Sequence, residues 1–365
     1  MTSVKQILRY MAISFFKSPA ETLCWLGRRC LYTLKEPAQV VLLQKIVRET
    51  PLLLQIETNN VCNSACIFCA YKSMKRKKGV MSLALFEKIV REYVEMGGGP
   101  VSLTPLMGDA LLDPHLLKRL QILTRHPEIN QITLTTNAIA LERYSDEEIC
   151  QLLSALYFMQ VSVGGLDSET YKTMYGVDQF PRVKASIARL IRLNRSIDLP
   201  AHLTVAFRTN DCRFEAHFKK ELDEYKKEGV FVSHISTYAN YAGAVSPNAE
   251  KNLVLGSIPR KKVKTCVSVG LSLAICWDGT ITACGCADFE GDKLTIGNAE
   301  TDKLTSVWSG ENRLEILESF NNGKLFPICR QCSAYTPDTV YASSAFNNVQ
   351  PHQPLPLDFF RKMMS

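Results

Sequence analysis

Between residues 50 and 236 the chain alternates apolar, strand-like segments with segments of helical periodicity. Such alternation predicts an α/β fold of parallel strands joined by helical crossovers. The predicted strands are 52–57, 101–106, 131–136, 157–163, 201–207 and 230–235. The predicted helices are 82–96, 114–125, 146–155, 181–194 and 214–228. We expect an open, partial (β/α)6 barrel with its functional site at the C-terminal ends of the strands.

Three cysteines follow the first predicted strand on one short loop. Cys62, Cys66 and Cys69 have the spacing C-x3-C-x2-C. A cubane [4Fe-4S] cluster ordinarily takes four thiolate ligands, so three would leave one iron open for another ligand. A zinc site is the alternative, although structural zinc prefers four closed ligands and no His or fourth Cys lies close in sequence. An open iron would make this loop a catalytic site.

The composition favours an enzyme of a reducing, cytoplasmic compartment. The chain has 13 cysteines in 365 residues, and their odd number, their clustering and the absence of a secretory signal favour metal ligation over disulfides. No apolar run reaches the roughly 18 to 20 residues that would span a bilayer. The formal net charge of +7 indicates mild attraction to anionic partners, and no nucleic-acid partner is expected. The basic run 75–78 is expected to be solvated and mobile.

Residues 1–50 are rich in leucine, isoleucine, phenylalanine and basic side chains. This pattern predicts an N-terminal extension of two short amphipathic helices, broken near Pro19. The helices would pack against the catalytic domain or lie on a membrane surface.

A second group of cysteines lies in the last third of the chain. Its four members are Cys266, Cys284, Cys329 and Cys332. The first two flank a predicted two-residue β-hairpin with an Asp278-Gly279 turn, and the last two form a C-x2-C pair. Four thiolates are therefore available for a second metal centre, for which zinc is again the alternative.

The first motif, with Phe68 beside its third cysteine, resembles the radical S-adenosylmethionine (SAM) superfamily. The C-x12-G-x4-C spacing that starts at Cys266 resembles the SPASM/Twitch extension of that family. The resemblance implies a partial barrel over 51–237, a small hairpin-plus-helix domain over 238–335 and a tail over 336–365. It also implies two [4Fe-4S] clusters, one that binds SAM and one auxiliary cluster. Because no cysteine follows Cys332, we expect the shortened Twitch form.

Further segments resemble the places where this family contacts SAM. Met107-Gly108-Asp109 resembles the family's Gly-Gly-Glu-Pro segment, which receives the amino group of SAM, and its glycine can bring the backbone close to a ligand. The residues that we expect to bind the cofactor are Met107, Gly108, Asp109, Asn137, Ser162 and Arg208. Asp167 is a candidate for the same role or for the N-cap of the next helix.

The remaining cysteines have other predicted roles. With the turn at Asp278-Gly279, Cys276 would pair opposite Ile281 and face away from Cys284, which favours a packing role. Cys286 would share the face of Cys284 if the strand continues, so it is predicted as a catalytic thiol or as a replacement ligand. Core or incidental positions are expected for Cys24, Cys30, Cys150 and Cys212.

The resemblance implies a radical SAM enzyme of the oxidoreductase type. The reduced cluster would give one electron to SAM, and the resulting 5′-deoxyadenosyl radical would take a hydrogen atom from a small-molecule or peptide substrate. Dehydrogenation with the auxiliary cluster as electron acceptor, epimerisation, and cross-linking of a ribosomal peptide are the outcomes that compete. The expected reductant is a flavodoxin- or ferredoxin-type protein. A non-catalytic iron–sulfur electron carrier is the alternative from another class.

Overall fold

The computed structural model describes residues 50–198, 200–211, 213–248, 252–262 and 264–337. The predicted N-terminal helices lie outside these ranges, as do nearly all of the predicted tail and Cys24, Cys30 and Cys212. Among the residues described, no helix is long and apolar enough to cross a membrane.

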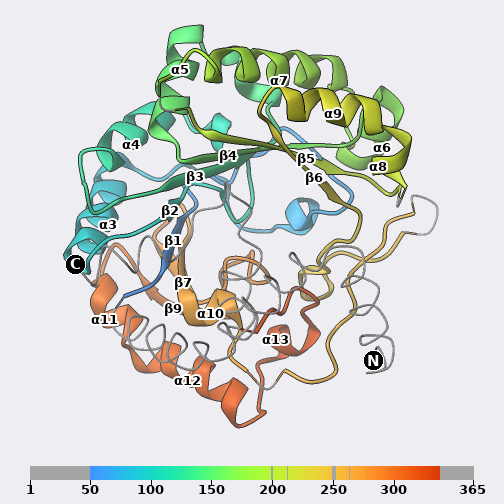
Figure 1. The fold of residues 1–365 in the computed structure, drawn as a ribbon. Helices are drawn as coiled ribbons and strands as arrows, with labels where there is room; N and C mark the ends of the chain where they lie inside the picture. The colour runs from blue at the N-terminus through green and yellow to red at the C-terminus, as the bar shows by residue number, and fades with distance from the viewer. Residues whose placement is uncertain (1–49, 199, 212, 249–251, 263, 338–365) are drawn as a thin grey trace, which may run out of the picture.

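One nine-stranded sheet organises the structure, with the strand order β6-β5-β4-β3-β2-β1-β7-β8-β9 (Figure 1). Its six parallel strands are β1 (Leu53–Ile56), β2 (Val101–Ser102), β3 (Ile132–Thr136), β4 (Phe158–Val163), β5 (His202–Arg208) and β6 (Phe231–Ile235). Each of these strands pairs with the next one in the chain, so the sheet is wound in one direction and curves. The edges β6 and β9 do not meet, which confirms the predicted open barrel.

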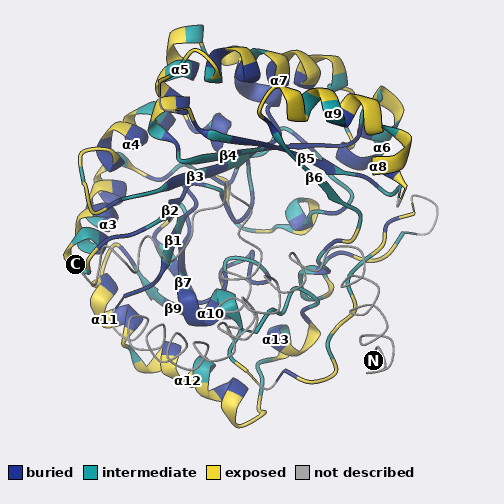
Figure 2. Cartoon of the chain, in the orientation of Figure 1, coloured by how far each residue is buried: buried dark blue, intermediate teal, exposed yellow. Residues whose placement is uncertain are grey.

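Helices cover the outer face of the curved sheet (Figure 1). They are α3 (Leu83–Glu95), α4 (Leu116–Leu123), α5 (Asp146–Ala155), α6 (Ser168–Tyr175), α7 (Phe180–Asn194), α8 (Phe214–His217) and α9 (Lys219–Lys227). Figure 2 shows buried residues on the sides of these helices that face the sheet and exposed residues on their outer sides. The predicted helix 214–228 is divided at Phe218, and the predicted strand 101–106 is paired only over its first two residues.

Local sequence signals explain where several helices begin. Ser82 accepts a hydrogen bond from the Leu85 N–H at the start of α3. Ser145 and Glu148 form a reciprocal capping box at the start of α5. Short 3-10 turns follow the strands at η1 (Ala70–Ser73), η2 (Ala110–Leu112), η3 (Ile139–Arg143) and η4 (Tyr241–Gly243). The caps at Ser82 and Ser145 satisfy backbone N–H donors that the start of a helix otherwise leaves unpaired.

The C-terminal part extends the barrel sheet. It contains α10 (Val267–Leu271), β7 (Ser272–Ile275), β8 (Thr280–Thr282), β9 (Thr295–Asn298), α11 (Leu304–Trp308), α12 (Glu311–Asn321) and α13 (Pro327–Gln331). Strand β7 pairs in parallel with β1, and β8 and β9 follow in antiparallel order. The strand that leads into the first cysteine loop therefore lies beside the hairpin of the second cysteine group.

The hairpin has a different register from the predicted one. Ile275, not Cys276, pairs opposite Ile281, because the loop contains three residues and ends at Gly279 with φ +85°. Glycine in this left-handed conformation is typical of three-residue hairpin loops. Cys276 is fully buried in a small apolar cluster with Leu106 and Ala274, which confirms its packing role.

Candidate functional site

A pocket of about 270 Å³ lies at the C-terminal ends of the parallel strands. Cys62, Cys66 and Cys69 line it. Five of the six predicted SAM contacts line it as well, namely Gly108, Asp109, Asn137, Ser162 and Arg208. The sixth, Met107, is buried beside it, with its sulfur 3.9 Å from the Cys69 sulfur. The fold therefore brings the first cysteine motif and the predicted cofactor contacts into one site.

The end of α6 holds the cysteine loop in place. The Ala65 N–H donates to the Tyr175 carbonyl at 2.9 Å, and the Ile67 N–H donates to the Met174 carbonyl at 2.9 Å. Gly176 ends α6 with φ +68°, and a Cβ atom there would lie 2.6 Å from the Ala65 carbonyl oxygen. Only glycine suits this close approach. Nothing in the local sequence predicts the contact, because it joins a loop to a distant helix.

The three thiols are disfavoured as anions in the protein alone. Burial, followed by the nearby Asp109 charge, raises the pKa of Cys62 to about 12. Burial and then the Cys69 charge raise the pKa of the Cys66 thiol as well. Metal ligation needs thiolates, and a cationic iron centre would offset both their burial and their mutual repulsion. The donor set therefore fits an iron–sulfur cluster.

Gly108 brings backbone close to the cysteine loop. Its φ is +131°, and an added Cβ atom would lie 3.0 Å from the Asn59 carbonyl oxygen. The next residue, Asp109, donates its N–H to the Val61 carbonyl at 2.8 Å. The Asn59 amide returns a hydrogen bond of 3.1 Å to the Asp109 carbonyl. The segment is thus docked against the start of the cysteine loop, as close backbone approach requires.

The Asp109 carboxylate is engaged within the protein. It accepts hydrogen bonds from the N–H groups of Leu111 (3.0 Å) and Asn137 (2.7 Å) and from the Thr136 hydroxyl (2.8 Å). Burial raises the pKa of this carboxyl, while its hydrogen bonds lower it. The carboxylate thereby joins the segment after β2 to the end of β3. Contacts between this segment and a ligand would then come from its backbone.

Asn137 lies next to Cys62 of the first cysteine motif. Its side-chain amide donates to Asn63 Oδ1 at 2.9 Å and lies 3.8 Å from Cys62 Sγ. Its own amide oxygen accepts the Ile139 N–H at 2.9 Å. Asn137 therefore orients the cysteine loop and also faces the pocket.

Ser162 and Arg208 lie on neighbouring strands at the pocket. Arg208 Nε donates to Ser162 Oγ at 3.3 Å, and the guanidinium lies over the Phe68 ring, 5.4 Å from its centroid. The ring of Phe68 also stacks on Tyr238 at 4.7 Å. Arg208 thus offers a fixed positive charge inside the pocket. Asp167, in contrast, caps α6 by accepting the Thr170 N–H at 2.8 Å.

Glu57, which sequence reasoning missed, joins four parts of the site. It follows β1, is fully buried and pairs with the Arg76 guanidinium through two hydrogen bonds of 2.6 and 2.9 Å. The same carboxylate accepts the N–H of Met107 at 3.1 Å and the N–H of Trp277. Burial raises its pKa, and Arg76 opposes that shift. Glu57 therefore fixes the cofactor-side segment against both the cysteine loop and the hairpin.

Replacing Glu57 by alanine is expected to lower the free energy of unfolding by about 3–5 kcal/mol, because Arg76 would stay buried without a counter-charge. The Arg76 side chain is only 11% exposed. Urea denaturation measures the change. Asp178→Ala is the control, since Asp178 and its partner Lys172 are 62% and 64% exposed and should lose at most about 1 kcal/mol. Equal losses in both variants would contradict this role for Glu57.

In the basic run after the cysteine loop, Lys75, Lys77 and Lys78 are exposed as predicted, whereas Arg76 is partly buried. The N–H groups of Lys75 and Arg76 donate to the Glu290 carboxylate at 2.7 and 3.1 Å. The Trp277 indole donates to the Lys77 carbonyl at 3.1 Å. The backbone of the run is thus held by the C-terminal part of the chain. The sequence does not predict these partners, because they are distant along the chain and reach the run only through the pairing of β7 with β1.

The four cysteines of the second group come together from separate elements. Cys266 precedes α10, Cys284 follows β8, Cys329 lies in α13, and Cys332 follows it. Burial, followed by the charges of Cys284, Cys266 and Cys332, raises the pKa of Cys329 to about 12. Burial raises the pKa of Cys284 to about 11. The other three thiols affect the pKa of Cys329, so the four lie near one another.

In the described ranges, no three His, Cys, Asp or Glu side chains are arranged to hold a single metal ion. A four-iron cluster binds each thiolate to a different iron, so it requires a wider arrangement than one ion does. The buried Lys262 closes this site. Its ammonium donates to the carbonyls of Cys329 (2.6 Å), Arg330 (3.2 Å) and Cys332 (2.5 Å). A lysine that binds three carbonyls of one turn was not predicted, because its partners are distant in sequence.

Cys286 lies beside the second cysteine group rather than on a strand. Strand β8 ends at Thr282, so the shared strand face that was expected for Cys284 and Cys286 is absent from the described structure. Burial, followed by the charges of Cys284 and Cys332, raises the pKa of the Cys286 thiol. Its role as a hydrogen donor or a replacement ligand stays a prediction.

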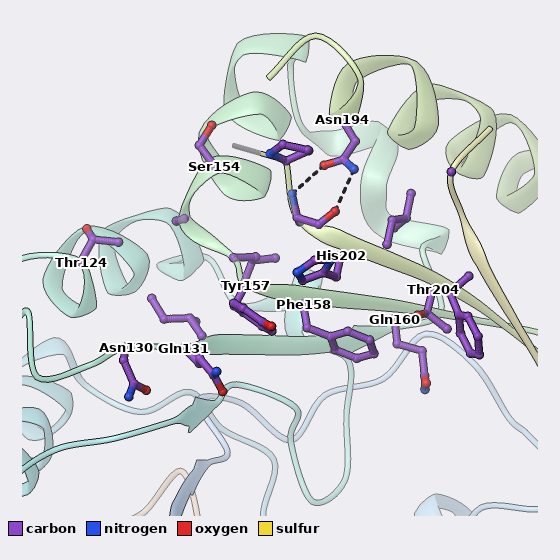
Figure 3. Close-up of a pocket in the computed structure, with 18 of the residues that line it drawn as sticks. Thr124, Asn130, Gln131, Ser154, Tyr157, Phe158, Gln160, Asn194, His202 and Thr204 are labelled. Atoms are coloured by element: carbon purple, nitrogen blue, oxygen red, sulfur yellow. Dashed lines mark hydrogen bonds between the residues drawn. The ribbon is translucent and has the colours of Figure 1, made fainter. Parts of the chain in front are cut away.

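A larger cavity of about 900 Å³ lies elsewhere, at the N-terminal ends of β3, β4 and β5 (Figure 3). Gln131, Phe158 and His202 line it, and Asn194 beside it binds the Ala201 backbone through two hydrogen bonds. None of the cysteines that the structure describes lines this cavity. The larger cavity is therefore separate from the pocket that the thiols line.

Comparisons with known families agree with the two cysteine sites. Residues 56–220 match the radical SAM superfamily, and residues 266–333 match SPASM, an iron–sulfur cluster-binding domain. GTP 3',8-cyclase of Pasteurella multocida is 25% identical over 139 residues, which are 37% of this chain and 40% of that protein. The match thus spans about two fifths of the length of such curated relatives.

Two solved structures share the fold. Streptococcus suis SuiB bound to precursor peptide SuiA is 16% identical with a TM-score of 0.55, over 84% of this chain and 75% of SuiB. Native anSMEcpe with bound AdoMet and Kp18Cys peptide is 14% identical with a TM-score of 0.53, over 82% of this chain and 96% of that chain. At these identities the likeness concerns the fold alone.

The two domain matches imply SAM and [4Fe-4S] clusters, which decides between the cluster and the zinc alternatives that the cysteine spacing left open. The matched ranges contain Cys62, Cys66 and Cys69 in the first domain and all four cysteines of the second group in the other. The open barrel, the thiol pocket and these matches together show that the chain belongs to the radical SAM superfamily and carries a SPASM-type domain.

Proposed function

We propose that this protein is a radical SAM oxidoreductase that takes a hydrogen atom from a small-molecule or peptide substrate. The observation that carries the proposal is that three thiols of one loop share a pocket with Gly108 and Arg208. When bound, the reduced cluster and SAM supply a carbon-centred radical that can attack an unactivated C–H bond. The chain's own residues position these groups and the substrate.

In this proposal Cys62, Cys66 and Cys69 would bind three irons of the first cluster and leave the fourth open. The backbone at Gly108 would bind the amino group of SAM. Arg208 offers a positive charge for a carboxylate, and Ser162 offers a hydroxyl for a ribose or carboxylate oxygen. These two side chains are hydrogen bonded to each other in the pocket, so they would act as one preformed contact.

The second group, Cys266, Cys284, Cys329 and Cys332, would hold the auxiliary cluster. Four protein ligands leave no open iron, which suits electron transfer better than substrate binding. This arrangement supports dehydrogenation, in which the substrate loses a second electron. Epimerisation, with Cys286 as hydrogen donor, and cross-linking of a ribosomal peptide are the further outcomes. We propose a flavodoxin- or ferredoxin-type protein as the source of electrons and a reducing, cytoplasmic setting.

A non-catalytic electron carrier is the alternative from another class. Such a protein needs no pocket beside its cysteines. Here the thiol pocket includes the Arg208 cation, the Ser162 hydroxyl and the left-handed Gly108. These groups have a ligand role in the enzyme proposal and none in the carrier alternative, so the enzyme is favoured.

Anaerobically reconstituted protein is expected to contain about eight irons and about eight sulfides per chain, by the cubane stoichiometry. The triple variant with Cys62, Cys66 and Cys69 replaced by alanine should contain about half of each, because the second group remains intact. Iron and acid-labile sulfide analysis measures both. About twelve irons per chain, or stoichiometric zinc, would contradict the proposed ligand sets.

A further inference from the structure

A strained turn lies between the two groups of cysteines. Tyr241, Ala242 and Gly243 have consecutive positive φ angles of 46°, 53° and 99°. Residues other than glycine rarely adopt this conformation, because it brings their Cβ atom too close to the backbone. Such a conformation persists only where surrounding contacts hold it.

Asn240 supplies the contacts that hold the turn. Its amide oxygen accepts the N–H of Ala242 at 3.1 Å and the N–H of Ser333 at 2.9 Å. Its amide nitrogen donates to the Gln331 carbonyl at 2.8 Å, and its own N–H donates to Ser333 Oγ at 2.9 Å. Gln331 and Ser333 flank Cys332. The strained turn is therefore anchored directly to the C-x2-C loop of the second group.

The phenol of Tyr241 reaches the first group. It lines the thiol pocket together with Cys62, Cys66 and Cys69. On the other side the ring lies edge-on to Phe289, with centroids 6.1 Å apart. Burial, followed by the effects of Cys69 and Cys286, raises the pKa of the phenol. Tyr241 thus spans the space between the two cysteine sites.

We propose that Asn240 and Tyr241 are positioning residues that couple the two cluster sites. The C-x2-C loop fixes Asn240, Asn240 fixes the strained turn, and the turn places Tyr241 in the thiol pocket, where its hydroxyl would donate to the Cys69 sulfur. Hydrogen bonds to cluster sulfurs help to set a cluster's reduction potential. The conformation of the C-x2-C loop would therefore affect the reduction potential of the SAM-binding cluster. A change at that cluster would in turn affect the C-x2-C loop. The inference rests on the proposed ligation of Cys69.

Tyr241→Phe removes only the hydroxyl, and we expect it to shift the midpoint potential of the SAM-binding cluster to a more negative value. An EPR-monitored redox titration of the full, reconstituted chain measures this, and the cluster is identified as the one whose signal changes when SAM is added. Tyr238→Phe is the matched control. Tyr238 lines the same pocket, but its hydroxyl donates to the backbone carbonyls of Thr209 and Ile235. Its loss should leave the potential unchanged.

Asn240→Ala should shift the potential in the same direction as Tyr241→Phe, although the phenol is still present. Ser333→Ala is a milder variant that removes one anchor and should give a smaller shift with full iron content. An unchanged potential in Tyr241→Phe would overturn the inference. A shift in Tyr241→Phe without one in Asn240→Ala or Ser333→Ala would overturn the link to the auxiliary loop. A wild-type protein without any SAM-responsive signal would instead contradict the proposed function itself.

Discussion

Replacing Cys66 by alanine is expected to abolish reductive cleavage of SAM. Cys66 is the central proposed ligand of a loop that has only three thiols, and its sulfur lies 3.1 Å from the Ser64 hydroxyl. Two remaining thiolates would not hold a cluster that already has one open iron. Anaerobic assays of 5′-deoxyadenosine formation under dithionite measure the loss, which should be complete.

Cys150→Ala is the matched control for this variant. Cys150 is a half-buried cysteine on α5, outside both thiol groups, so its replacement should leave the iron content and SAM cleavage unchanged. Residual cleavage by the Cys66→Ala protein would show that the loop is not the ligand set. Loss of cleavage in both variants would show that the assay reports general damage.

The double replacement of Cys329 and Cys332 by alanine should separate the two sites. The auxiliary cluster would be lost, so iron should fall from about eight to about four per chain. The first cysteine loop does not contain these residues, and part of the SAM cleavage should therefore remain. Thermal stability should also fall, because a cluster that joins the hairpin to the C-x2-C loop contributes folding energy.

The double variant has two outcomes that would contradict this division of roles. Complete loss of SAM cleavage, as in Cys66→Ala, would show that the second group is needed to assemble the first site. Full retention of about eight irons would show that these cysteines are not ligands. Lys262→Met is a useful companion, because it removes the three hydrogen bonds to the carbonyls of this turn and keeps the thiols.

Much of the fold could be predicted from periodicity. The parallel strands and their helices occur where apolar alternation and helical spacing placed them, and Asp167 and Ser145 cap helices as their local sequence suggests. The hairpin near Asp278 was also expected. Its register was not, because Asp-Gly is compatible with two-residue and three-residue loops, and the choice depends on how β7 pairs with β1.

The cysteines of both groups could be found from spacing, whereas their supports could not. Glu57, Lys262 and Asn240 act through partners that are distant in sequence, so no local pattern distinguishes them from ordinary polar residues. Arg76 illustrates the same limit. As part of a basic run it suggested solvent, yet it lies beside Glu57 because the hairpin covers the loop. Contacts with residues that are distant in sequence determine whether such a side chain is buried.

Cleavage of SAM by the wild-type protein tests the central claim most directly. The protein should be reconstituted anaerobically with iron and sulfide, reduced with dithionite and given SAM without any substrate. We expect 5′-deoxyadenosine and methionine in equal amounts, together with a change in the EPR signal of one cluster when SAM binds. Intact SAM in a protein that holds about eight irons would contradict the claim, because both clusters would then lack an accessible iron.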